Sequence, residues 1–223
     1  MNQDRNINKI IKKLCKEIFP SDVFQKGNSR VYLDDNGYYF TMIEFQPYSL
    51  GKGTFLNVGL SFFFDKSDFL SFSYAYNNEC RIGKNFIEYK NDEQFEKDVR
   101  KYVELANDYI LKYRQFADIN YAKQYIVNIL NDDNWNPYIK AMFCFLTDEQ
   151  ENGRKYYQMF LDEPFFKRII DRDDYPKDAA EMNKDYVINM IIKQREFWHS
   201  KSSMKKMKMM ELTKNTFTGD IYE

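Results

Sequence analysis

The residues that could carry out chemistry in this sequence are few and scattered. The single histidine, His199, follows Trp198 near the end of a helical pattern, and the chain has no Gly-x-Ser-x-Gly motif that would present a nucleophilic serine. A hydrolytic triad needs a histidine held between a carboxylate and a nucleophile. We therefore expect His199 to lie at a helix end, where the helix dipole favours its charged form, and we assign no catalytic residue.

The sequence also lacks a recognisable set of metal ligands. Cys15, Cys80 and Cys144 are more than sixty residues apart, which is not the spacing of a zinc site. The aspartates of residues 171–178 are interleaved with basic residues and lack the glycine and final glutamate of a calcium loop. We expect no metal and no cofactor, and an odd number of dispersed cysteines is typical of reduced thiols in the cytoplasm.

The segment Gly-Lys-Gly-Thr at residues 51–54 invites comparison with a phosphate-binding loop. That motif needs a glycine, four residues, then Gly-Lys-Ser/Thr, followed by a helix. Here Gln46 occupies the position of the first glycine, and Gly53 replaces the hydroxyl residue. Residues 55–64 alternate in the manner of a strand. The two glycines are therefore predicted to connect two strands.

The elements that would position any site have clear periodicities in the first half of the chain. Residues 4–18 place apolar side chains at spacings of three and four, with lysines between them, which predicts an amphipathic helix. From residue 23 the period drops to two, and Asp-Asp-Asn-Gly at 34–37 predicts a β-hairpin. Strand-like patterns over 71–77 and 80–89 complete an antiparallel sheet of about five or six strands.

From residue 92 onward the pattern is helical, and the last helix is predicted from about residue 176 to about residue 198. The predicted fold class is α+β: an N-terminal helix packed on an antiparallel sheet, followed by a C-terminal helical bundle. We expect an α+β domain over residues 1–115 and a helical region over 116–223, packed on the first.

Charge and hydropathy limit the classes of partner. The formal net charge is −1 and the longest apolar runs are short, so we expect neither nucleic-acid binding nor membrane insertion. The N-terminus lacks the apolar stretch of a signal peptide, which again favours a cytoplasmic protein. The Lys- and Met-rich segment 201–212 is interpreted as a frayed terminal helix whose methionines cover the bundle, with a basic docking segment as the alternative.

Short motifs in the first half resemble a known family. Phe24, Lys26 and Gly27 follow the first helix, Gln46 ends a hydrophobic strand, and an Asn-x-Gly begins at Asn57 and ends at Gly59. This arrangement, over roughly residues 5–115, resembles a bacterial family classed as a domain of unknown function. The resemblance implies the same fold and a bacterial setting. Members can occur near toxin systems, which implies an immunity-type binding role.

Two groups of residues are candidates for binding. Gln46 and Asn57 either line a pocket on the sheet face or satisfy backbone groups at a strand end. Residues 91–200 carry 21 acidic against 16 basic residues, and an acidic, aromatic-rich surface suits a basic protein partner. Asp132, Asp133 and Trp135 are the candidate docking residues there.

We therefore expect a non-enzymatic bacterial protein-binding module, of the immunity type for a toxin, whose oligomeric state the sequence does not determine. The alternative is a small-molecule or nucleotide-processing enzyme with its site on the sheet face, near Gln46 and Asn57. In the binding interpretation the tyrosines and Trp135 supply the energetic anchors.

Overall fold

The computed structural model describes residues 2–75, 79–82, 86–172, 175–212 and 217 of the chain. The chain divides into two compact units. The sheet unit comprises Met1–Phe62, Ser67–Arg114 and Trp198–Met210, and the helical unit comprises Phe63–Lys66, Gln115–Phe197 and Glu211–Glu223. Among the described residues, no helix is both long and apolar enough to cross a membrane.

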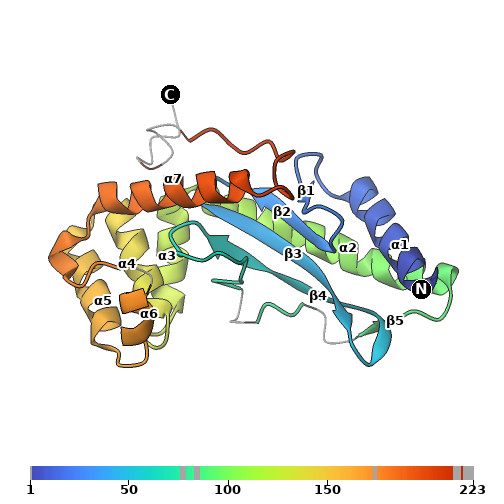
Figure 1. The fold of residues 1–223 in the computed structure, drawn as a ribbon, viewed down its shortest axis with the longest axis horizontal. Coiled ribbons are helices and arrows are strands. Elements are labelled where there is room, and N and C mark those ends of the chain that lie inside the picture. The colour runs from blue at the N-terminus through green and yellow to red at the C-terminus, as the bar shows by residue number, and fades with distance from the viewer. Residues whose placement is uncertain (1, 76–78, 83–85, 173–174, 213–216, 218–223) are drawn as a thin grey trace. The chain divides into compact units, whose positions relative to one another are not determined.

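The sheet unit is built on a five-stranded sheet in the order β1-β2-β3-β4-β5, in which each neighbouring pair is antiparallel (Figure 1). The strands are β1 (Phe24–Gln25), β2 (Val31–Asp35), β3 (Tyr39–Tyr48), β4 (Gly51–Phe62) and β5 (Ile87–Glu88). An N-terminal helix precedes this sheet and several helices follow it. The α+β class predicted from the sequence is therefore confirmed.

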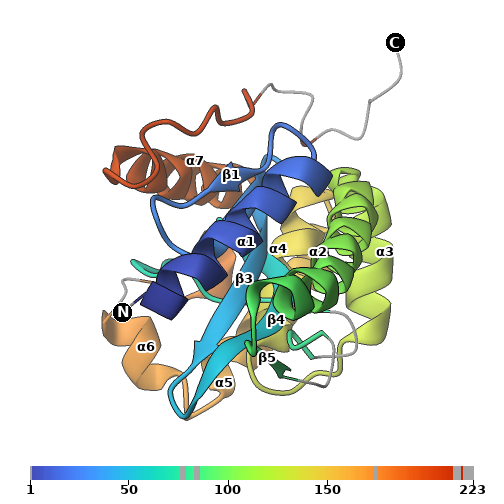
Figure 2. The same cartoon turned by 90° about the vertical axis from the view of Figure 1, so that its right-hand side faces the viewer.

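Two helices, α1 (Asn2–Ile18) and α2 (Asp92–Arg114), lie side by side over β3 and β4 (Figure 2). The apolar stripe of α1 is buried as its periodicity predicts: Ile7 and Leu14 are 0% exposed. Each such side chain contributes about 1.5–3 kcal/mol when fully buried. Ion pairs on the outer surface, including Arg100 to Glu17 at 2.8 Å, join the two helices.

The hairpin predicted at residues 34–37 connects β2 and β3. Gly37 has φ +86°, a conformation that glycine adopts without the strain of a side chain, and its N–H donates to Asp35 Oδ1 at 3.1 Å. The predicted connection near residues 51–53 lies two residues earlier, because the chain turns at Ser49 and Leu50. Gly53 is part of β4, and strand follows it, so no phosphate-binding loop forms.

The sequence overestimates the strands after residue 70. In the two segments predicted as strands, the described residues form two isolated bridges, Tyr74 with Leu60 and Arg81 with Asn57. They also form the two-residue strand β5. Residues 76–78 and 83–85 of these predicted strands lie outside the described part of the chain. The remaining strand is β1, at the opposite edge of the sheet.

The helical unit contains α3 (Ile119–Ile129), α4 (Asn136–Leu146), α5 (Gln150–Asp162), α6 (Lys167–Arg172) and α7 (Lys184–Ser200), whose last three residues belong to the sheet unit. Every residue of α4 from Pro137 to Leu146 is buried. Trp135 packs on Tyr138 at a ring separation of 4.9 Å and on Phe160 at 5.1 Å. Helix α4 and these aromatic rings form the core of the unit.

The last helix starts later than predicted and ends within two residues of the predicted position. Asp178 caps a short 3-10 turn at Ala179–Glu181, and Asn183 Oδ1 accepts from the Tyr186 N–H at 2.9 Å at the start of α7. Residues 201–212 are not helical, so the terminal helix expected there does not form. Met204 and Met207 are 0% and 4% exposed, and both belong to the sheet unit. The expectation that the methionines of this segment cover the helical bundle is therefore not met.

Candidate functional site

The two polar strand residues singled out in the sequence, Gln46 and Asn57, lie in one network on the sheet. In the register of β3 and β4, Glu44 is opposite Asn57. On the other side of β4, Arg81 pairs with Asn57 through an isolated antiparallel β-bridge. Directly opposite residues point to the same face of a sheet. Asn57 is 4% exposed. Its side-chain amide donates to Glu44 Oε2 at 2.9 Å and to Gln46 Oε1 at 3.0 Å.

Arg81 completes this network. Its Nη2 donates to Gln46 Oε1 at 2.8 Å, and its guanidinium lies 4.2 Å from the centre of the Phe55 ring. Sequence reasoning missed Arg81, because it lies 35 residues from Gln46 along the chain. It also missed Glu44, although the period-two spacing of Glu44 and Gln46 is a signal that both face the same way. The side chains of Gln46 and Asn57 hydrogen-bond to each other and hold an arginine.

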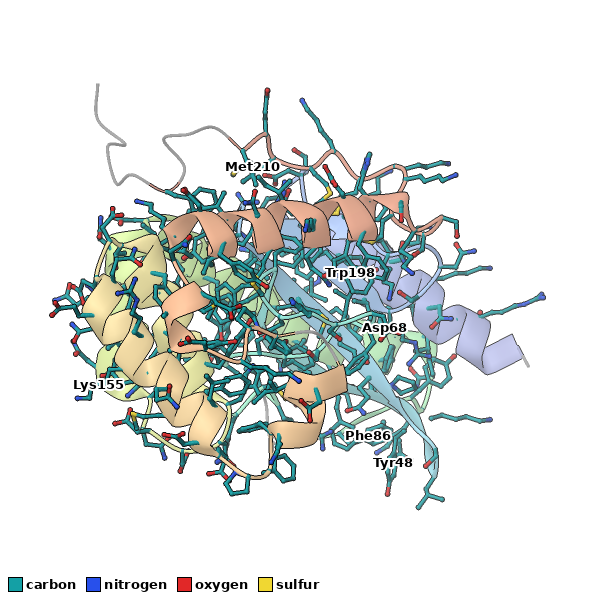
Figure 3. All side chains as sticks on the ribbon, turned by 60° about the vertical axis from the view of Figure 1, so that its left-hand side comes forward. Tyr48, Asp68, Phe86, Lys155, Trp198 and Met210 are labelled. Carbon is teal, nitrogen blue, oxygen red and sulfur yellow. The ribbon has the colours of Figure 1, made fainter. Side chains whose placement is uncertain are left out.

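An aromatic surface adjoins the network at the end of the β3–β4 hairpin. Tyr48 is 44% exposed, and its ring meets those of Phe55 and Phe86 edge-on, at 5.7 and 5.5 Å. Figure 3 shows Tyr48 and Phe86 beside each other at this end of the hairpin. Leu50, in the turn itself, is 84% exposed. We call Tyr48, Leu50, Phe55, Arg81 and Phe86 the hairpin tip.

The candidate docking residues of the helical unit are engaged in local structure. Asp132 accepts from the Nζ of Lys140, whose side chain is 5% exposed, at 2.5 Å. Asp133 accepts from the side-chain amides of Asn131 and Asn134 at 2.7 and 3.1 Å. Trp135 packs in the aromatic core described above. The three residues share one loop, where they balance a buried lysine, order the turn and fill the core.

Other acidic side chains of the helical unit are likewise paired within it. Asp148 binds Lys184 at 2.6 Å and Asp171 binds Lys177 at 2.7 Å. Hydrogen bonding to Lys177 lowers the pKa of Asp171, and Lys123 does the same for the pKa of Glu149. The acidic surplus read from the sequence therefore includes many carboxylates that already have a basic neighbour.

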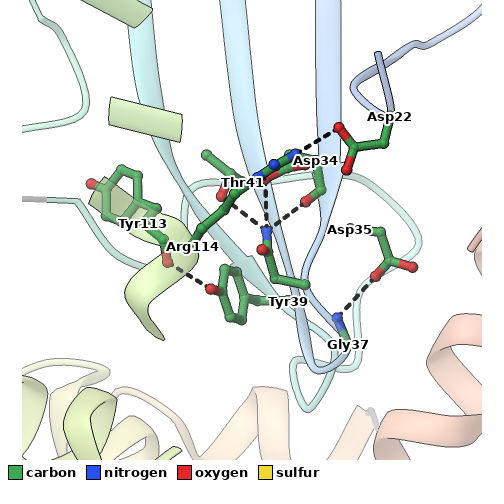
Figure 4. A network of polar contacts seen from close by, with 9 residues as sticks. Asp22, Asp34, Asp35, Gly37, Tyr39, Thr41, Tyr113 and Arg114 are labelled. Atoms are coloured by element: carbon green, nitrogen blue, oxygen red, sulfur yellow. Dashed lines mark hydrogen bonds and ion pairs between the residues drawn. The ribbon is translucent and has the colours of Figure 1, made fainter. Parts of the chain in front are cut away.

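A second polar network ties the end of α2 to the β2–β3 hairpin (Figure 4). Arg114 donates to Asp34 from Nε at 3.0 Å and from Nη2 at 2.7 Å, and Nη2 also reaches Asp22 at 2.7 Å. Asp34 is 2% exposed and also accepts from the side-chain amide of Asn36. The hydrogen bond from Arg114 lowers the pKa of Asp22, and the bond to Asp34 raises that of Arg114. The network joins elements of the sheet unit.

The residues with catalytic or metal-binding potential remain apart. His199 is exposed in the last turn of α7, where the sequence places it. The described residues contain no group of three or more His, Cys, Asp or Glu side chains positioned to hold a metal ion, and Asp173 and Asp174 lie outside them. Burial raises the pKa of Cys15 to about 12 and that of Cys144 to about 11, so both thiols stay protonated.

Comparison of the chain with models of known families, with curated protein sequences and with solved structures finds no match. The resemblance to a bacterial family of unknown function therefore stays a prediction. The interpretation of the hairpin tip rests on its own chemistry.

Proposed function

We propose that this protein is a protein-binding module and that its docking surface is the hairpin tip. The observation that carries the proposal is the exposure of Leu50 and Tyr48, 84% and 44%, beside an ordered cluster of aromatic rings and an arginine. Tyrosine and arginine are enriched among the residues that dominate binding energy in protein interfaces. Large apolar side chains gathered on one exposed surface are a further sign of an interaction site.

The hairpin tip is held in place before any partner arrives. Phe55 and Phe86 pack at a ring separation of 5.1 Å, and the hydrogen bond to Gln46 fixes Arg81 over Phe55. Ordering a flexible side chain costs about 0.5–1.5 kcal/mol on binding. Because these side chains are already ordered, more of the contact energy appears as affinity. The network of Gln46, Asn57 and Glu44 thus has a supporting role in binding.

The charges beside the hairpin tip define the partner's chemistry. Lys52 and Arg81 are exposed there, and the sheet unit as a whole carries 20 Lys and Arg against 15 Asp and Glu. The partner is a protein that offers an apolar pocket bordered by carboxylates, since complementary charges steer association. An immunity-type role is one form of this function, in which the partner is a toxin domain.

A basic partner would instead dock on the helical unit, which carries 19 Asp and Glu against 13 Lys and Arg. The local pairing of Asp132 with Lys140 weakens the case for that surface. It is the second candidate, and the same experiment distinguishes the two.

The test is a calorimetric titration of the purified products of neighbouring genes into the protein. We expect one of them to bind, and the Leu50→Asp and Tyr48→Ala variants to bind it at least about tenfold more weakly, which corresponds to about 1.4 kcal/mol. The matched control is Leu111→Asp on α2, which adds the same charge at an apolar position that is 50% exposed. This control should bind as the unaltered protein does.

Other outcomes would contradict the proposal. If the double variant Asp132→Lys and Asp133→Lys loses binding while Leu50→Asp keeps it, the docking surface lies on the helical unit. If light scattering shows that the protein alone forms a dimer that Leu50→Asp dissociates, the tip binds a second copy of this chain. If no product binds and a metabolite screen shows turnover that Arg81→Ala abolishes, the protein is an enzyme with its site on the sheet face.

A further inference from the structure

A separate basic cavity lies in the sheet unit, between α1 and the segment that contains β1 and the start of β2. Figure 2 shows α1 and β1 next to each other. The cavity has a volume of about 250 Å³, and Arg5, Lys9 and Lys12 of α1 line it together with Arg30 and Tyr32. Its other described lining residues are asparagine, glutamine, serine and isoleucine, so no carboxylate among the described side chains lines it. None of the hairpin-tip residues belongs to this cavity.

The positive charges on the α1 side have no counter-charge in the described structure. Arg5, Lys9 and Lys12 make no ion pair with any described side chain, whereas Lys13, one residue further, binds Glu96 of α2 at 2.6 Å. The three cations are spaced by four and three residues, so they lie on one face of the helix and repel one another. An anion between them would remove this repulsion.

Groups on the strand side provide hydrogen bonds. The Arg30 guanidinium is held in position, because Nη1 donates to the Gly53 carbonyl oxygen at 3.1 Å and Nε donates to Asn8 Oδ1. Tyr32 also lines the cavity, but it is 5% exposed and its hydroxyl is buried beside the Cys15 thiol, so it offers the cavity ring surface and no hydrogen bond.

We propose that this cavity binds a small ligand that carries two linked phosphate groups. Four cationic side chains suit a compact polyanion, and arginine matches phosphate oxygens with paired hydrogen bonds. A cavity of about 250 Å³ lies below the usual range for drug-sized ligands, about 300–1,000 Å³, which favours the diphosphate group itself as the part recognised. The diphosphate can be free or part of a nucleotide.

The experiment is a calorimetric titration at a constant ionic strength of about 0.15 M, with inorganic diphosphate, ADP, orthophosphate and sulfate as probes. The test variant is Lys9→Gln with Lys12→Gln. The control variant is Lys97→Gln with Lys101→Gln, which removes the same charge from exposed positions of α2. Thermal unfolding checks that both variants are folded.

We expect diphosphate to bind more tightly than orthophosphate or sulfate. Its affinity should fall at least about tenfold in the test variant and stay unchanged in the control. Tighter binding of ADP than of diphosphate would assign the diphosphate to a nucleotide, and equal binding would assign it to the free anion.

Two results would overturn the proposal. One is the absence of binding by both diphosphate and ADP to the unaltered protein. The other is an equal loss of affinity in the test and control variants, which would show a general effect of net charge. Neither result bears on the hairpin tip, since the two surfaces share no residue.

Discussion

At the scale of single residues, Asp34 depends on Arg114. The carboxylate is 2% exposed, and the guanidinium donates two hydrogen bonds to it. Removing one partner of a buried pair leaves an uncompensated charge. We predict that Arg114→Ala lowers the free energy of unfolding by about 2–4 kcal/mol, somewhat less than for a fully buried pair because 31% of the Arg114 side chain is exposed. Urea denaturation measures this change.

Arg100→Ala is the matched control for Arg114→Ala. Arg100 also donates two hydrogen bonds to one carboxylate, that of Glu17, but the Glu17 side chain is 49% exposed. Exposed pairs contribute about 0–1 kcal/mol. If the two variants lose similar free energies of unfolding, burial of Asp34 does not increase the stabilisation that its pair with Arg114 provides.

At the scale of elements, the pairing of β4 with β5 requires a glycine at position 53. A Cβ there would lie 2.0 Å from the Ile87 carbonyl oxygen, and φ is +154°. We predict that Gly53→Ala destabilises the protein by about 1–3 kcal/mol and separates β5 from β4. Denaturation gives the stability. Hydrogen exchange of the Tyr89 amide, which donates to the Lys52 carbonyl oxygen at 2.7 Å, reports the pairing in the unaltered protein and in the variant.

Gly51→Ala is the comparison for that change. The three atoms nearest to a Cβ at position 51 all belong to side chains, and the closest of them is in the Phe86 ring at 3.2 Å. A ring can move where a backbone carbonyl cannot, so Gly51→Ala should cost less than Gly53→Ala. The reverse order would refute the close approach of β5.

The segment after α7 is the other element whose contribution can be measured. Met204 is 0% exposed in the sheet unit, and Met210 is 46% exposed. We predict that Met204→Ala lowers the free energy of unfolding by about 2–5 kcal/mol, as for other buried methionines, and that Met210→Ala changes it by about 0.5 kcal/mol or less. Equal, small effects would show that the segment is not packed on the sheet unit in solution.

At the scale of the whole molecule, the three cysteines give a separate signal for each unit. Cys15 lies in the sheet unit and Cys144 in the helical unit, both buried, and Cys80 is partly exposed. We predict that a thiol reagent at a pH of about 8 labels Cys80 quickly in the native protein. The other two should react only after unfolding, because burial keeps them protonated and shielded.

Mass spectrometry of labelled peptides along a urea gradient would follow the two buried thiols individually. Coincident labelling of Cys15 and Cys144 would show that the units unfold together, and separate midpoints would show that they unfold independently. Rapid labelling of Cys144 in the native protein would contradict its burial in α4.

The sequence by itself determined the elements whose side chains repeat regularly. Helices α1 and α2 and the β2–β3 hairpin appear as predicted, because a continuous apolar stripe or an Asn-Gly turn acts through neighbours in the chain. The absence of a phosphate-binding loop at residues 51–54 was predictable for the same reason, since β4 continues directly from them.

Only the tertiary structure decided which distant segments meet. Alternating residues in 71–89 favour strands, yet a strand forms only where a partner offers hydrogen bonds. Of this segment, the described residues before β5 form only single bridges with β4. The sequence named Gln46 and Asn57, but Arg81 joins them through a pairing that no local pattern encodes. Likewise, the spacing of methionines after residue 200 shows that they are apolar, and only the fold shows that they are buried in the sheet unit. Periodicity is a property of neighbours along the chain, whereas a binding surface depends on contacts between segments that are distant in the sequence.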